Sequence, residues 1–239
     1  MTNATDSEKE AVPPFATVAF SLGEALVAVA MTLALYYLQK VLLFRVFSPV
    51  SDNVRFAMAT VSVPMGLGLP IAWLVRRKGQ TLVSAFRLHR SAWPRSFLIA
   101  ITLTLAIENL YAHVSRAHAL GGIMPSPIPT LFGIEIGRVS PLARAIGVVA
   151  ALVLAPFSEE LFFRGLLFGA FRSVLSTPCV VVLTSALFAF LHFTPWGIVP
   201  LTVAALSYAV AALWARSLAA AIMAHAFQNM LALIPLLLL

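Results

Sequence analysis

Apolar residues along this chain gather into long runs, separated by short segments that contain charged residues, glycine or proline. Most of these runs approach the roughly 20 residues that a helix needs to cross a bilayer. The pattern therefore predicts an all-α, polytopic transmembrane bundle of about seven spans, with a range of six to eight. The expected spans are 15–39, 54–75, 97–115, 142–172, 177–193, 198–215 and 217–238.

Three of these runs differ in length from an ordinary span. The runs at 177–193 and 198–215 are short, whereas the run at 142–172 is too long to cross a bilayer at a right angle. Pro156 lies inside the long run, where its ring removes a backbone donor. We therefore expect tilted helices and a break near Pro156.

Composition supports a membrane protein. Of the 239 residues, 61% are hydrophobic and 10% are charged, and the mean hydropathy is +0.96. A soluble domain needs far more polar surface than this. The net charge of +7 lies in loops between apolar runs and not on one amphipathic face, so no nucleic-acid partner is expected. The lipid bilayer is the expected surrounding.

Basic residues are unevenly distributed between the loops. The loop at 76–95 has no acidic residue, and its basic residues are Arg76, Arg77, Lys78, Arg87, Arg90 and Arg95. Positive charge beside membrane spans marks the cytoplasmic side. We therefore expect this loop and the N-terminus to be cytoplasmic. The compact length favours a multi-pass protein of the bacterial cytoplasmic membrane.

Polar side chains occur inside three of the C-terminal spans, at a similar depth. At 1.5 Å per residue, Glu159 and Asn229 each lie roughly 20 Å from the basic end of their span, and His192 lies roughly 22 Å from the start of its own. Ionisable groups at membrane depth are costly, so the helices that carry them face a partner or a water-filled cavity. Independent structural residues have no reason to agree in depth, which predicts one shared site.

Spacing within the long span separates two neighbouring carboxylates. Glu160 and Arg164 are four residues apart and can form an ion pair on one helix face, so we expect them to support the site structurally. Glu159 points about 100° away from Glu160 and stays out of reach of Arg164. Glu159 is therefore predicted to be the free carboxylate.

The other two spans each add a spaced pair. Phe188 lies one turn before His192 and is expected to pack against its ring, and His225 and Asn229 also share a face. A carboxylate with an imidazole can deprotonate water, which makes Glu159 and His192 a candidate general base. An imidazole N–H and an amide N–H suit an oxyanion, which assigns that role to His225 and Asn229. The predicted reaction is hydrolysis of an acyl bond.

These residues resemble a known family. Glu159, Glu160 and Arg164 form EExxxR, Phe188 and His192 form FxxxH, and His225 and Asn229 form HxxxN, in the order found in the CAAX protease and bacteriocin-processing family of intramembrane endopeptidases. The resemblance covers about 141–239. It divides the chain into a polar cytoplasmic tail (1–14), N-terminal spans and loops (15–140) and a catalytic core (141–239).

The resemblance implies hydrolysis of a peptide bond in a membrane-embedded or lipidated protein or peptide. It implies that Glu159 and His192 activate water, and that His225 and Asn229 stabilise the oxyanion. A metal role has also been proposed for similar residues in the family, in which case the ligands would be Glu159, His192 and His225. The sequence contains no HExxH motif of the zincin type. We predict that no cofactor is needed, with zinc as the alternative.

Two other classes of membrane protein use buried polar residues. Clusters of Glu, His and Arg also mark the ion pathways of transporters and proton relays. Transport is less well supported, because no pair of inverted repeats or of broken helices is visible. A b-type haem protein could use His192 and His225 as axial ligands, and an absorbance spectrum tests that reading.

Overall fold

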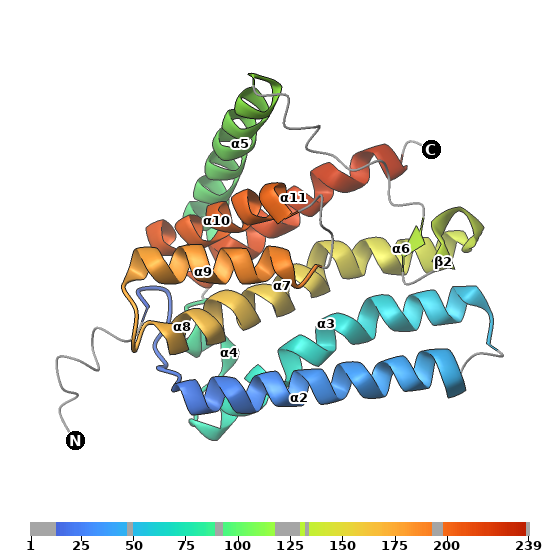
Figure 1. Ribbon diagram of the computed structural model, residues 1–239, viewed down its shortest axis with the longest axis horizontal. Coiled ribbons are helices and arrows are strands. Elements are labelled where there is room, and N and C mark those ends of the chain that lie inside the picture. The colour runs from blue at the N-terminus through green and yellow to red at the C-terminus, as the bar shows by residue number, and fades with distance from the viewer. Residues whose placement is uncertain are drawn as a thin grey trace.

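The computed structural model describes residues 13–46, 50–88, 93–117, 130–131, 134–192 and 198–237. Nearly all of the tail expected at 1–14 lies outside these residues. The described chain is a bundle of helices (Figure 1), and it includes α2 (Leu22–Val41), the π-helical turn η1 (Leu42–Val46), α3 (Asp52–Arg77), the short α4 (Leu82–Ala85), α5 (Trp93–Ala117), α9 (Thr177–Phe190), α10 (Ile198–Ala215) and α11 (Leu218–Leu237).

The long run predicted at 142–172 is helical from residue 141 to residue 171. It is divided into α6 (Pro141–Val149), the π-helical η4 (Ala150–Leu154), α7 (Ala155–Glu160), the π-helical η5 (Leu161–Leu167) and α8 (Phe168–Phe171). Before it, β1 (Thr130–Leu131) pairs antiparallel with β2 (Ile134–Glu135), which leads into the 3-10 turn η3 (Ile136–Arg138).

The break expected near Pro156 takes the form of a widened turn. Pro156 lies in the first turn of α7, directly after η4, and the N–H of Ala155 donates to the carbonyl of Ala150. This bond to the fifth preceding residue widens the helical turn just before the proline, and the chain stays helical through it. A second widened turn, η5, follows Glu160 and contains Arg164.

Four described helices are long and apolar enough to cross a membrane: Leu22–Val41, Asp52–Arg77, Pro141–Phe171 and Ile198–Ala215. Trp93–Ile107, Thr177–Phe190 and Leu218–Leu233 are apolar but shorter. The all-α, integral-membrane class is therefore confirmed. A count of seven spans stays a prediction, as do the cytoplasmic N-terminus and the bacterial membrane.

The first span begins later than predicted. Residues 13–21, the N-terminal strap, are not helical, and α2 starts only after Ser21 and Glu24 form a capping box. Four of its apolar side chains are nevertheless buried, those of Phe15, Ala16, Val18 and Phe20. Phe15 packs on Phe168 at 5.3 Å between ring centroids. Hydropathy does not distinguish a buried extended segment from the first turns of a helix, whereas the Ser–Glu capping pattern does.

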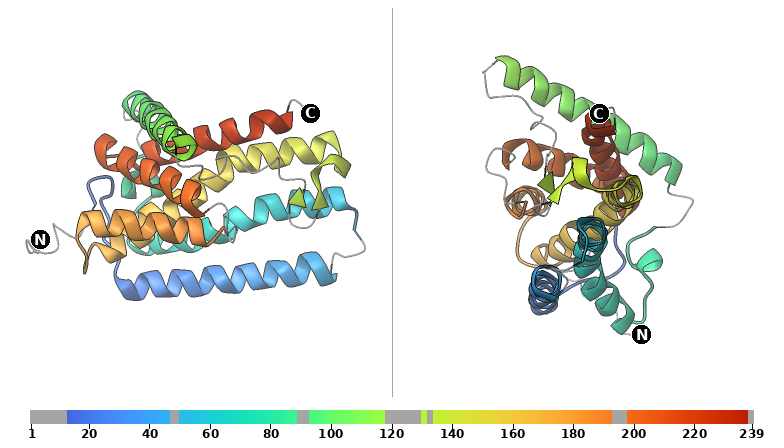
Figure 2. Two further views of the ribbon diagram at one scale, coloured as in Figure 1. Left: turned by 45° about the horizontal axis from the view of Figure 1, so that its top comes forward. Right: turned by 90° about the vertical axis from the view of Figure 1, so that its right-hand side faces the viewer.

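The long 141–171 helix lies in the middle of the bundle, between α3 and α11, and α2 packs on the far side of α3 (Figure 1). On the other side, α10 packs against α5, α9 and α11. Figure 2 shows α5 crossing the outer side of this group at a steep angle. The arrangement brings α7, α9, α10 and α11 together around the polar residues.

Candidate active site

Two fully buried side chains form the inner part of the site. Arg164 donates from Nη1 to Glu160 Oε1 at 2.9 Å and from Nη2 to the carbonyl of Ala205 on α10 at 2.6 Å. Both Glu160 and Arg164 have 0% side-chain exposure. The structure thus forms the ion pair that the four-residue spacing predicted. It adds a backbone acceptor that comes from a different helix.

His225 brings α11 into the same network. Its Nδ1 lies 3.0 Å from Glu160 Oε1, the oxygen that also accepts from Arg164. A carboxylate only accepts, so Nδ1 carries the hydrogen. The other ring nitrogen, Nε2, faces Glu159 Oε2 at 3.9 Å. Sequence analysis assigned Glu160 to Arg164 alone and missed that it also orients His225.

Glu159 is placed differently from its neighbour. Its Oε2 has no hydrogen-bond partner among the described residues and lies 4.0 Å from His192 Nε2. The side chains of Glu159 and His192 are 18% and 36% exposed, so this part of the site is the accessible one. Four ångströms is too long for a direct hydrogen bond and suits one bridging water.

His192 is oriented by its own helix. Its Nδ1 lies 2.7 Å from the carbonyl of Phe188, which can only accept, so the hydrogen is on Nδ1. In the neutral ring the lone pair is then on Nε2, the atom that faces Glu159. Phe188 also lies under the ring, with 4.5 Å between centroids. Phe188 thus has the packing position that its spacing predicted.

Asn229 lies one turn beyond His225 on α11. Its Nδ2 donates to the carbonyl of Ala151, in the widened turn η4, at 2.8 Å. An amide carries two N–H donors, so this bond leaves it able to make another. Glu159 Oε2 lies 3.9–4.0 Å from the Nε2 atoms of His192 and His225. The bond of Asn229 is to η4 and not to these three side chains.

Tyr208 is a site neighbour that sequence analysis missed. Its ring stacks on that of His225 with 4.8 Å between centroids and 9° between planes. Tyr208 is eight residues before Arg216, which places it roughly 12 Å from the basic end of its span. This is close to the depth of His225, so the same depth argument could have found Tyr208.

The spacing of the donor atoms at the centre of the site differs from that of the ligands of a tetrahedral zinc. Glu159 Oε2, His192 Nε2 and His225 Nε2 are suitable ligand types. Ligands at about 2.0–2.2 Å from one tetrahedral zinc lie roughly 3.3 Å apart, whereas the distances here are 3.9 and 4.0 Å. Among the residues that the structure describes, no group of three has a metal-binding arrangement. In this arrangement the three atoms are spaced more widely than the ligands of a tetrahedral zinc.

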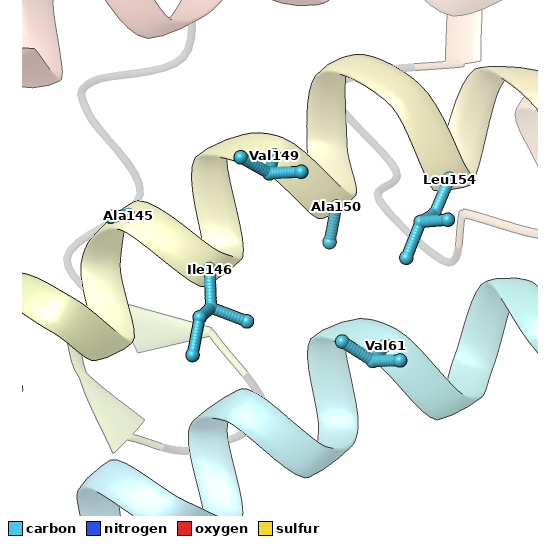
Figure 3. Close-up of a pocket in the computed structure, with 6 residues that line it drawn as sticks. All are labelled: Val61, Ala145, Ile146, Val149, Ala150 and Leu154. Carbon is cyan, nitrogen blue, oxygen red and sulfur yellow. The ribbon is translucent and has the colours of Figure 1, made fainter.

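A separate groove of about 250 Å³ lies between α3 and the α6–η4 segment (Figure 3). Its lining is wholly apolar and consists of Val61, Ala145, Ile146, Val149, Ala150 and Leu154. With no polar group, the groove supplies nothing to acid–base chemistry. The titratable side chains of the site lie in the cluster around Glu159.

Fold and site together define a helical membrane protein with a buried carboxylate–histidine cluster. Residues 141–231 match the model of the family described as type II CAAX prenyl endopeptidase Rce1-like. The matched segment contains every residue of the three motifs, from Glu159 to Asn229. The resemblance to the CAAX protease family of intramembrane endopeptidases is therefore confirmed over residues 141–231. No curated protein and no solved structure matches the chain.

Proposed function

We propose that this protein cleaves a peptide bond in a membrane-embedded or lipidated protein, using water activated between Glu159 and His192. One observation carries the proposal: Glu159 Oε2, which has no hydrogen-bond partner among the described residues, lies 4.0 Å from His192 Nε2. Both atoms accept hydrogen bonds, so a water between them donates one hydrogen to each. Its oxygen is then directed away from both, toward a substrate carbonyl.

The reaction proceeds in two proton transfers. Glu159 takes a proton from the water while the water oxygen bonds to the carbonyl carbon and His192 holds the second hydrogen. The C–N bond of the tetrahedral intermediate then breaks, and the protonated Glu159 returns its proton to the leaving nitrogen. This requires no group other than the substrate, one water and the side chains at hand.

His225 stabilises the oxyanion only in its charged form. Because Nδ1–H is bound to Glu160, a neutral ring has no hydrogen on Nε2. An imidazolium donates from Nε2 and keeps its bond to Glu160. It also balances charge, since Glu159, Glu160 and Arg164 together carry one excess negative charge. Asn229 supplies the second donor from its remaining amide hydrogen.

The substrate is proposed as a class. The matching family is described as a type II CAAX prenyl endopeptidase, and two helical segments that carry the site, 141–171 and 198–215, are long and apolar enough to cross a membrane. A lipidated peptide and a membrane-embedded segment can both reach a site in this position. The bilayer delivers either one, and no cofactor is part of the proposal.

The experiment uses the full chain in lipid nanodiscs with three peptides: a farnesylated CAAX peptide, the same peptide without the lipid, and a hydrophobic transmembrane peptide. Mass spectrometry identifies the new ends. We expect cleavage of at least one peptide by the wild type and none by Glu159→Gln. Equal cleavage by the two proteins would remove Glu159 from the mechanism. No cleavage, together with proton uptake into proteoliposomes, would favour the transporter alternative.

A further inference from the structure

Tyr208 lies outside the three motifs but contacts two members of the buried network. Its ring stacks on His225, and the guanidinium carbon of Arg164 is 5.4 Å from its centroid. It comes from α10, whereas Arg164 belongs to η5 and His225 to α11. Tyr208 is 2% exposed, so these contacts are made inside the bundle.

The contacts close a ring of four side chains. His225 binds Glu160, Glu160 binds Arg164, Arg164 lies beside Tyr208, and Tyr208 stacks on His225. The backbone of α10 holds the same guanidinium, because Ala205 accepts from Arg164 Nη2 three residues before Tyr208. Because α10 contributes both the Ala205 carbonyl and the Tyr208 ring, its position is tied to the orientation of Arg164 and of His225.

One hydrogen bond does not define the plane of an imidazole. The torsion that turns a histidine ring is broad, so a ring held only at Nδ1 can tilt about that bond and move Nε2. A parallel neighbour removes this freedom. The stack on Tyr208 covers one face of His225, and Phe188 meets the ring at 78° with 5.4 Å between centroids. Together with Glu160, these contacts leave one orientation, in which Nε2 faces Glu159.

We propose that Tyr208 is a positioning residue that fixes the His225 ring, so that Nε2 stays directed at the place where the oxyanion forms. The inference rests on the proposed function for its effect on catalysis. The geometric part, that Tyr208 sets the ring plane, does not depend on it. This role depends on stacking by the aromatic face of Tyr208. A phenylalanine at this position should therefore still fix the His225 ring, and an aliphatic side chain should not.

The kinetic test compares Tyr208→Leu and Tyr208→Phe in the full chain, with Trp214→Leu as a control. Trp214 is an aromatic residue of the same helix that is 62% exposed. A displacement of about 1 Å at a reacting centre costs on the order of 10²-fold. We expect Tyr208→Leu to lower kcat by about this factor with little change in KM, and the other two variants to keep wild-type kcat. In a His225→Gln background, Tyr208→Leu should add nothing.

The spectroscopic test reads the ring itself and needs no substrate. In protein labelled with ¹⁵N-histidine, the His225 ring resonances are assigned by their loss in His225→Gln. We expect the ring-current shift from Tyr208 to remain in Tyr208→Phe. In Tyr208→Leu it should disappear, and the Nδ1–H signal should broaden.

These results separate the two claims. Wild-type His225 resonances in Tyr208→Leu would overturn the positioning role, whether or not the protein is a protease. Equal loss of the shift and of kcat in Tyr208→Phe and Tyr208→Leu would also overturn it, because the hydroxyl and not the stack would then matter. If the spectra are as expected but the protein cleaves no peptide, the positioning role stands and the proposed function is rejected.

Discussion

Glu159 and Glu160 are neighbours in the chain, yet they belong to parts of the site that differ in kind. The buried half consists of Glu160, Arg164 and His225, linked by contacts of 2.9 and 3.0 Å. The open half consists of Glu159 and His192, which stand 4.0 Å apart and are partly exposed. Glu160 thus accepts two hydrogen bonds at Oε1, whereas no hydrogen bond within the described residues reaches Glu159 Oε2.

The difference shows that one helix can carry a carboxylate that stabilises the site, Glu160, next to a carboxylate placed to bind water, Glu159. A buried carboxylate without partners is costly, and Glu160 reduces that cost through two charge-assisted bonds at Oε1, while its Oε2 has no hydrogen-bond partner among the described residues. Glu159 makes no such bond within the described residues and lies beside two imidazoles, which is a poor arrangement for stability and a useful one for binding water. Stability and catalysis should therefore respond separately to substitutions in the two halves.

The largest expected effect is the loss of activity in the open half. Glu159→Gln keeps the shape of the side chain but cannot take a proton, so peptide hydrolysis should fall by about 10²- to 10⁴-fold. The melting temperature in detergent should stay that of the wild type. Glu24→Gln is the matched control, because Glu24 pairs with Lys78 away from the site. Wild-type turnover by Glu159→Gln would contradict the division into halves.

The buried half should show the opposite balance. Glu160→Gln and Arg164→Ala each leave a buried group without its partner, which costs about 3–5 kcal/mol when such a pair is broken. The two losses should be coupled in a double-mutant cycle followed by thermal melting. The exposed pair Asp52 and Arg55 is the control, and breaking it should cost less than about 1 kcal/mol. Strict additivity at Glu160 and Arg164 would argue against the network.

Asn229 belongs to neither half, since its bond is to the carbonyl of Ala151 in η4, and its replacement tests the oxyanion role separately. Asn229→Ala removes an oxyanion donor, which should lower kcat by about 10²- to 10³-fold. It also removes the bond to Ala151, at about 1 kcal/mol of stability. Asn229→Asp keeps the size of the side chain without the donor and should lose kcat similarly. Full activity in either variant would remove Asn229 from the oxyanion site.

The smallest expected effect is that of metal removal. The distances from Glu159 Oε2 to His192 Nε2 and to His225 Nε2 exceed those between the ligands of a tetrahedral zinc, and the proposed mechanism does not use a metal. Dialysis against a chelator should therefore leave the cleavage rate unchanged, and elemental analysis should find no stoichiometric zinc in active protein. Loss of cleavage that returns only with added zinc would overturn the metal-free mechanism.

Much of the architecture could be predicted from the sequence, because membrane spans are recognised by their length and hydropathy. The helices 141–171 and 198–215 agree closely with the predicted runs. The strap at 13–21 was misplaced, since a buried extended segment is as apolar as a helix. A break was expected near Pro156, but the chain stays helical there, and the widened turn found in its place depends on neighbours that hydropathy does not describe.

For the site, local spacing was enough where both partners are on one helix. The pairing of Glu160 with Arg164, the packing of Phe188 on His192 and the freedom of Glu159 from Arg164 all follow from helical periodicity. Equal depth also indicated that three helices share one site. What it could not give was the set of contacts made between those helices.

Those contacts were decided by tertiary structure alone. The second bond of Glu160 to His225, the backbone acceptor at Ala205 and the stack of Tyr208 on His225 join residues far apart in the chain. Their existence depends on how far each helix is rotated and shifted against the next, to within an ångström or two. Sequence periodicity determines which residues share a face of one helix, whereas only packing determines which faces meet.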